Sequence, residues 1–167
     1  MNRLLWWLFG IVVVIVVGYI ILRVLVVQVS TMPENLGVNQ NMSVNQNRLA
    51  PCPDTPNCVS SYATDAEHAI DPLNYTADQD AVMNALEQTI RALPRSQIVT
   101  REDGYLHAVL RSRMMGFVDD LEFYVSEPGV IQVRSAARLG QSDLGANRRY
   151  VETIRQALQA RLGNSSN

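Results

Sequence analysis

The sequence predicts an α+β fold, in which an antiparallel β-meander packs with two amphipathic helices and is preceded by an N-terminal transmembrane helix. A long uncharged run opens the chain, and a series of strand-like segments occupies its second half. On either side of that series, apolar residues recur at helical spacing. We therefore divide the chain into a transmembrane anchor (1–29), a polar tether (30–48) and an exported α+β domain (49–167).

The anchor rests on residues 4–22, which carry no charge, and on an apolar run that continues past Arg23 to Val27. A helix of this length crosses the hydrocarbon region of a bilayer. A cleaved signal peptide has a shorter apolar region and a small-residue cleavage site, so the following "VQVSTMPEN" favours an uncleaved anchor. Arg3 and the amino terminus favour a cytoplasmic N-terminus and a periplasmic or otherwise extracytoplasmic domain. Arg23 lies on the opposite side, where its long side chain can snorkel to the headgroups.

Charge and composition narrow the classes of partner. The formal net charge is −2, so no broad basic surface is available for nucleic acid. The tether repeats "VNQN" at residues 38 and 44 and is too polar to form a core. We expect contact with the bilayer through residues 4–27, no nucleic-acid partner and no cofactor.

Two segments are expected to form the helices that cover the sheet. Residues 77–93 have acids in the first turn and Pro94 just beyond the end, and residues 147–163 close at Gly163. The apolar stripes are Val82, Leu86, Ile90 and Leu93 in the first segment, and Val151, Ile154, Leu158 and Leu162 in the second. The stretch from the proline-rich loop to Tyr75 shows no regular pattern.

Strands are predicted over 97–102, 104–112, 116–125 and 130–138. In the last hairpin, alternation places Phe123 opposite Val133 and Glu122 opposite Arg134. That register needs a loop with an odd number of residues, such as 127–129. The expected Glu122–Arg134 ion pair is then part of a solvated sheet face.

The chain has 2 cysteines, Cys52 and Cys58, both in the proline-rich loop "PCPDTPNCVSS". In an exported domain the favoured interpretation is a structural disulfide that pins this loop. The alternatives are a redox pair, which more often has two intervening residues, and a metal site, which needs further ligands. We expect no metal.

Asp119 is predicted on the apolar face of its strand, where a carboxylate is costly unless it is paired. Arg138, Arg148 or Arg149 could pair with it. Arginines in a helix's first turn oppose the macrodipole, so either acids of the protein or a bound anion should compensate them. The candidate binding residues are Arg134, Arg138, Ser142, Asp143, Asn147, Arg148, Arg149, Asp119 and Asp120.

Catalysis has less support. The sequence contains no G-x-S-x-G elbow, and its histidines, His68 and His107, have no visible nucleophile to serve. His107 is expected at the surface of a strand. Asp119 and Asp120 are adjacent, so alternation sends them to opposite faces and makes them a poor acid/base pair.

Three stretches together resemble a known family: "LAPCPDTPNCVSS" (49–61), "GFVDDLEF" (116–123) and "VRSAARLGQSDLGANRRYVETIRQAL" (133–158). The sequence is similar to the domain-of-unknown-function family 1499 (DUF1499), found in bacterial envelope-associated proteins and plastid relatives. The resemblance implies functional weight at Cys52, Asn57, Cys58, Asp119, Asp120, Arg134, Ser135, Arg138, Asp143, Asn147 and Arg148. It implies no reaction.

We therefore expect a membrane-anchored cell-envelope protein whose exported domain binds an envelope protein or a small anionic ligand. It is more readily interpreted as a binding protein than as an enzyme. One alternative is an envelope hydrolase that uses Asp119 or Asp120 as a base. Another is a structural or assembly module without a small-molecule site.

Overall fold

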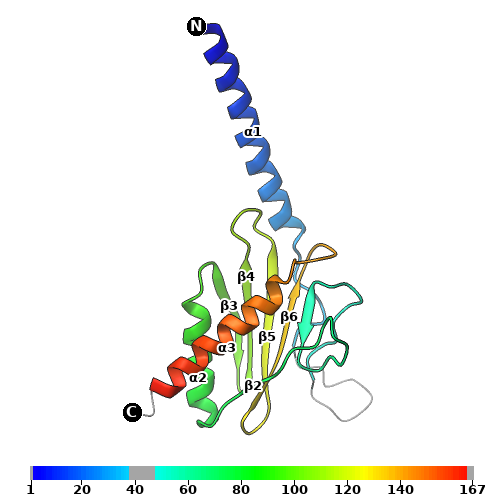
Figure 1. Cartoon of the computed structure of the whole chain (residues 1–167), viewed down its shortest axis with the longest axis vertical. Coiled ribbons are helices and arrows are strands. Elements are labelled where there is room, and N and C mark those ends of the chain that lie inside the picture. The colour runs from blue at the N-terminus through cyan, green and yellow to red at the C-terminus, as the bar shows by residue number, and fades with distance from the viewer. Residues whose placement is uncertain (1, 38–47, 165–167) are drawn as a thin grey trace.

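The protein, seen here as a computed structural model that describes residues 2–37 and 48–164, has a long N-terminal helix followed by an α+β domain (Figure 1). Helix α1, Asn2–Val29, projects away from the domain, and its apolar side chains are exposed. Its length and composition suffice to cross a bilayer, which is also true of a signal sequence. The "VNQN" repeat of the expected tether lies outside the described residues.

The domain is built on one antiparallel sheet with the strand order β1-β6-β5-β4-β3, and β2 also pairs with β6. The strands are β1 (Cys58–Ser60), β2 (Leu73–Asn74), β3 (Ser96–Glu102), β4 (Tyr105–Arg111), β5 (Val118–Glu127) and β6 (Val130–Ala137). Strands β3 to β6 confirm the predicted meander. Strands β1 and β2 were not predicted, because they are 3 and 2 residues long and too short to show alternation.

Tight turns set the register of the meander. Asp103 and Gly104 join β3 to β4, and Gly104 has a left-handed φ of +68, which glycine adopts without steric cost. Strands β5 and β6 pair in the predicted register, with Glu122 opposite Arg134. The loop is shorter than expected, because pairing continues to Glu127 opposite Val130. A bulge before Glu127 supplies the extra residue that we had placed in the loop.

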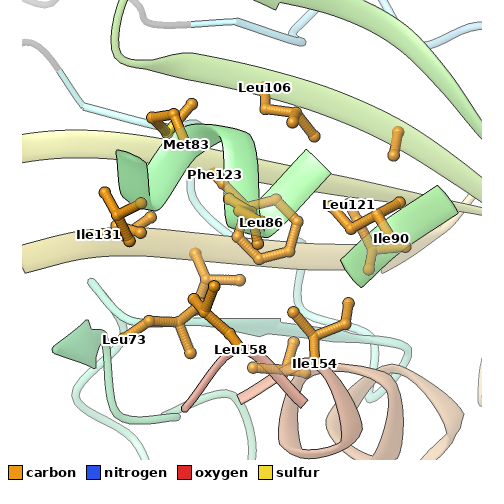
Figure 2. Packing of buried hydrophobic residues seen from close by; sticks show 14 of the residues in the cluster. Leu73, Met83, Leu86, Ile90, Leu106, Leu121, Phe123, Ile131, Ile154 and Leu158 are labelled. Atoms are coloured by element: carbon orange, nitrogen blue, oxygen red, sulfur yellow. The ribbon is translucent and has the colours of Figure 1, made fainter. Parts of the chain in front are cut away.

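Helices α2 (Gln79–Arg91) and α3 (Ala146–Asn164) cover one face of the sheet (Figure 1). Asp78 caps α2, since its Oδ1 accepts the backbone N–H of Ala81 at 2.8 Å. Figure 2 shows side chains from both helices meeting those of the sheet in one core. The predicted stripes supply its helical part: Val82, Leu86 and Ile90 from α2, and Val151, Ile154 and Leu158 from α3.

Alternation along β5 divides its side chains between the two faces of the sheet. Leu121 and Phe123 lie in the core under the helices. Asp120 and Glu122 therefore point to the opposite face, which neither helix covers. Both acids are nevertheless buried.

Candidate functional site

The helix-free face of the sheet holds a group of hydrogen-bonded polar side chains. They come from adjacent strands of the antiparallel sheet, and they meet because residues that are paired across such strands point to the same face. We term this group the polar cluster: Tyr105 and His107 of β4, Asp120 and Glu122 of β5, Arg134 of β6, and Arg138 just after β6.

Asp120 joins His107 to Arg138. Its Oδ1 lies 2.8 Å from His107 Nε2, and Arg138 donates to both carboxylate oxygens at 2.8 Å. Burial alone would raise the pKa of Asp120, but the hydrogen bonds from His107 and Arg138 outweigh it and hold the pKa below its usual range. Asp120 is thus an ionised acceptor, and Nε2 of His107 carries the proton in their hydrogen bond.

Glu122 holds the other half of the polar cluster. Its Oε1 accepts from the Tyr105 hydroxyl at 2.9 Å and from the backbone N–H of Gly37 at 2.7 Å, and its Oε2 accepts from Arg134 at 3.0 Å. The predicted Glu122–Arg134 ion pair is confirmed. The expected solvation of this face is wrong, because Glu122 is 0% and Arg134 is 5% exposed. A carboxylate is tolerated at this depth since both of its oxygens have donors.

The segment that follows α1 helps to cover the polar cluster. The carbonyl of Ser30 accepts from Arg138 at 3.0 Å, and Gly37 donates to Glu122 at 2.7 Å. Ser30 itself is buried. Residues 30–37 therefore contact the domain, although we had expected a tether that holds it off the membrane.

One donor of the polar cluster has no acceptor. The Nε atom of Arg134 is buried and makes no hydrogen bond with any part of the chain that the structure describes. An unpaired buried donor costs about 1–3 kcal/mol. Arg134 lies opposite Ser60 of β1, which places this donor next to the proline-rich loop.

A cavity of about 340 Å³ lies beside that loop. Its polar lining comes from Arg48, Asp54, Ser60, Tyr62, Thr64, Asp65 and His68. The guanidinium of Arg48 lies 4.7 Å from the centre of the Tyr62 ring, within the range of a cation–π contact. The volume falls in the range typical of small-molecule sites.

His68 gives this cavity a titratable group. Its Nδ1 lies 2.7 Å from Asp65 Oδ1, and its Nε2 lies 3.3 Å from the carbonyl of Thr55. Partial burial lowers the pKa of His68, but the hydrogen bonds to Asp65 and Thr55 together raise it above its usual value. Neither ring nitrogen is bonded to Ser60, so the described residues do not form a serine–histidine pair here.

The proline-rich loop forms one wall of the cavity. The sulfur atoms of Cys52 and Cys58 lie at disulfide-bonding distance, with their Cα atoms 5.7 Å apart, as predicted. Asn57, inside the loop, donates to the carbonyl of Gly140 at 2.7 Å, and its own carbonyl accepts from Asn147 at 3.0 Å. These contacts tie the loop to the start of α3.

Asp119 lies on the other face of the sheet, under α3. It is 4% exposed, and burial, reinforced by the charge of Asp143, raises its pKa to about 7 although Asn147 donates a hydrogen bond. Asn147 also accepts from the Ser135 hydroxyl, which completes a polar group at the start of α3. The three arginines considered as partners of Asp119 bind other groups, and the hydrogen bond to Asp119 comes from Asn147.

The arginines at the start of α3 bind backbone carbonyls. Arg148 donates to Ala69 at 2.8 Å and to Glu67 at 3.0 Å, and Arg149 donates to Leu144 at 2.8 Å. Asp143 accepts the backbone N–H groups of Gly145 and Asn147 at 2.8 and 2.7 Å. The acid therefore stabilises the helix N-terminus and forms no ion pair with either arginine.

The structure brings the predicted site residues together in separate groups. Asp120, Arg134 and Arg138 meet on the helix-free face. Asp119, Asp143 and Asn147 meet under α3. Arg148 and Arg149 instead bind backbone carbonyls, and Ser142 accepts the N–H of Leu144 at 3.2 Å. None of these residues lines the cavity beside the proline-rich loop.

Part of the polar cluster was not predicted from the sequence. His107, expected at the surface, is 3% exposed and bonded to Asp120. Alternation along residues 104–112 contained a signal for this, because Tyr105 and His107 share a face and both pair with β5 residues of the helix-free side. No pattern in the sequence indicated that residues 30–37 contact the polar cluster. Among the described residues, no three His, Cys, Asp or Glu side chains gather as a metal site.

Comparison with known proteins gives a family match. Residues 48–158 match the model of DUF1499, described as a protein of unknown function. The match covers every strand and α2, and it ends within α3. A search of curated proteins found no match to the chain.

Proposed function

The chain belongs to the DUF1499 family, and from this premise we propose that it is a single-pass membrane protein whose exported domain binds a small ligand carrying an anionic group. The family supplies no activity, so the proposal depends on the anchor, the disulfide loop and the cavity. The cavity beside the proline-rich loop is the observation that carries the binding function.

Contacts between α1 and the domain favour a retained anchor over a cleaved signal. The Tyr19 hydroxyl donates to the carbonyl of Met114 at 2.5 Å, and Arg138 binds the carbonyl of Ser30 just after the helix. Cleavage beyond residue 37 would also remove the backbone N–H of Gly37, which donates to Glu122. A segment that satisfies buried charges of the mature domain is poorly suited to removal.

The disulfide loop supports an exported domain. Cys52 and Cys58 are placed for a disulfide, and such bonds persist in oxidising compartments. Arg3 precedes the apolar run and favours a cytoplasmic N-terminus. The domain then lies on the periplasmic or extracytoplasmic side of a cell-envelope membrane.

Within the cavity, Arg48 and Tyr62 suit an anionic group next to a flat apolar part, although Asp54 and Asp65 also line it and Asp65 is bonded to His68. Arg48 offers a guanidinium, and protonated His68 would add a second cation as the pH falls. Tyr62 offers a ring face on which a planar ligand can stack. Arg148 and Arg149 are the second candidate position, because their guanidinium groups bind carbonyls and keep their charge.

Binding can be tested with phenyl phosphate, which combines an aromatic ring with an anion. Calorimetric titration of the full-length protein in detergent micelles should show saturable binding, and Arg48→Ala should weaken it by roughly tenfold. Arg149→Ala removes the same charge at the second candidate position, and Arg91→Ala, on the exposed side of α2, is the matched control outside both positions. Loss of binding in Arg149→Ala alone would move the site to the start of α3. Absence of binding to the wild-type chain would count against a site for this type of anion.

The hydrolase alternative gains no comparable support. Asp120 is held ionised between His107 and Arg138, and Asp119 lies under α3 against Asn147. Neither carboxylate lines the cavity. A general base must reach its substrate, so these positions favour structural roles for both acids.

A further inference from the structure

Loops of the domain meet the C-terminal end of α1 at one end of the sheet, where β5 begins and β6 ends. Strand β5 pairs with β6 through Asp119 and Ala137, so the β4–β5 loop and the β6–α3 loop leave the same end of the sheet. Figure 1 shows this end beside the C-terminal end of α1. We term residues 112–117 and 138–145 the anchor-side edge.

The anchor-side edge touches α1 at several levels. Tyr19 donates to the carbonyl of Met114 at 2.5 Å. Gly116 lies next to the helix, since a Cβ there would be in van der Waals contact with it, 3.4 Å from Val27 Cγ2 and 3.7 Å from Arg23 Nε. The helix is thus fixed along the β4–β5 loop over its last turns.

These contacts set the depth of the loop relative to the apolar run. An α-helix rises 1.5 Å per residue, so Tyr19 lies about 6 Å from Arg23 towards the middle of the run. A bilayer's hydrocarbon region takes about 20 helical residues, and a span that begins at residue 4 ends near Arg23. The backbone at Met114, bonded to Tyr19, therefore lies within about 6 Å of the level at which hydrocarbon meets headgroups.

The side chains of the edge suit that environment. Met114 is 72% exposed, Phe117 is 38% exposed and Leu144 is 85% exposed. Two exposed arginines flank these residues: Arg113 precedes Met114 in the loop, and Arg149 of α3 binds the carbonyl of Leu144. Apolar side chains flanked by arginines are typical of segments that lie in the interface of an anionic bilayer.

We propose that the anchor-side edge is a second membrane-contact surface, with Met114, Phe117 and Leu144 inserted at the interface and Arg113 and Arg149 on anionic lipid headgroups. The inference depends on the proposed membrane span of α1. It adds that the domain lies on the bilayer in a fixed orientation, with the β5–β6 turn pointing away from it.

Fluorescence quenching by lipids that carry bromine on their acyl chains tests this directly. The full-length protein is placed in vesicles of phosphatidylcholine and phosphatidylglycerol, and the probe is a tryptophan from Met114→Trp. Trp6→Phe and Trp7→Phe remove the background, because the chain has 2 tryptophans. The matched control is Glu127→Trp, an exposed position at the opposite end of β5.

We expect the Met114→Trp probe to be quenched several-fold more than the Glu127→Trp probe. Equal, weak quenching of both probes would overturn the proposal, and would leave the edge available to a protein partner instead. Quenching of Trp6 and Trp7 in the unmodified chain shows separately whether α1 is inserted in the bilayer. If Trp6 and Trp7 are quenched and the Met114→Trp probe is not, only the edge contact fails, and if Trp6 and Trp7 escape quenching, the membrane span fails as well.

The charge component has its own test. In vesicles without phosphatidylglycerol, quenching of the Met114→Trp probe should fall, and Arg113→Gln with Arg149→Gln should abolish the dependence on this lipid. Quenching that is the same in neutral and anionic vesicles would contradict a role for the arginines.

Discussion

Glu122 and Arg134 face each other across β5 and β6, and their ion pair at 3.0 Å is closed to solvent. Both charges lie on the sheet face that no helix covers. The pair is satisfied by contacts from distant parts of the chain, since Gly37 reaches Glu122 across 85 positions. The segment after α1 is therefore part of the folded domain.

Removing one partner of this pair should destabilise the domain strongly. Glu122→Ala leaves the Arg134 guanidinium buried without its acceptor, which typically costs about 3–5 kcal/mol. Thermal unfolding of the full-length protein in micelles measures the loss. Glu127→Ala, on the exposed end of the same strand, should change stability by less than about 0.5 kcal/mol. Similar unfolding temperatures for both variants would contradict a buried, energetically coupled pair.

Asp119 should make stability depend on pH. Its pKa is raised to about 7 in the folded state, so folding favours the protonated acid. This contribution is complete below the unfolded pKa of about 4 and is lost as pH rises through about 7. Asp119→Asn removes the titration, so its stability relative to wild type should increase by about 2–3 kcal/mol between pH 5 and pH 8.

The matched control for this pH effect is Asp71→Asn, which changes an exposed acid. Unfolding free energies of the three proteins, measured at several pH values, make the comparison. A parallel pH profile for Asp119→Asn and wild type would show that Asp119 titrates in its ordinary range.

Reduction of the Cys52–Cys58 bridge should lower the domain's stability by about 2 kcal/mol, because the closed loop is short. The Cys52→Ser, Cys58→Ser variant should match the reduced wild type. The loop also carries Asn57, which holds Gly140, so amide exchange in the β6–α3 loop should accelerate on reduction. An unchanged unfolding temperature after complete reduction would show that the loop is held by its other contacts alone.

Arg138→Lys should loosen the segment that follows α1. Lysine cannot keep the two-point contact with Asp120 together with the bond to Ser30. We expect faster hydrogen exchange at Gly37 and a loss of about 1–3 kcal/mol in stability. Arg113→Lys, on an exposed loop position, is the control. Unchanged exchange at Gly37 would show that Glu122 alone retains the segment.

Local patterns in the sequence predicted the framework of the fold. The stripes through Leu86 and Ile154 placed α2 and α3, and strand parity placed Glu122 opposite Arg134. The bulge before Glu127 did not change that register. It adds one unpaired residue to β5, which has the same effect on the pairing as the extra loop residue that we expected. Short-range periodicity carries this information in the sequence itself.

Contacts between distant segments were beyond such patterns. Whether the helix-free face is covered depends on where residues 30–37 run, and the bond from Arg138 to Ser30 joins positions 108 apart. The contact of Asp119 with Asn147 was not predicted for a similar reason. An arginine would neutralise the carboxylate of Asp119, but the side-chain amide of Asn147 lies next to it instead. Alternation shows which face of the sheet Asp119 is on and does not show which side chain of α3 contacts it.

The account depends most on a retained anchor that carries an exported, oxidised domain, and the intact mass of the membrane-bound protein tests both parts together. The protein should be extracted from membranes without reductant and measured by mass spectrometry. We predict a chain that still contains α1 and is lighter than the reduced chain by the hydrogens of Cys52 and Cys58. A product cleaved before residue 37, or a full-length chain with free thiols, would contradict the account.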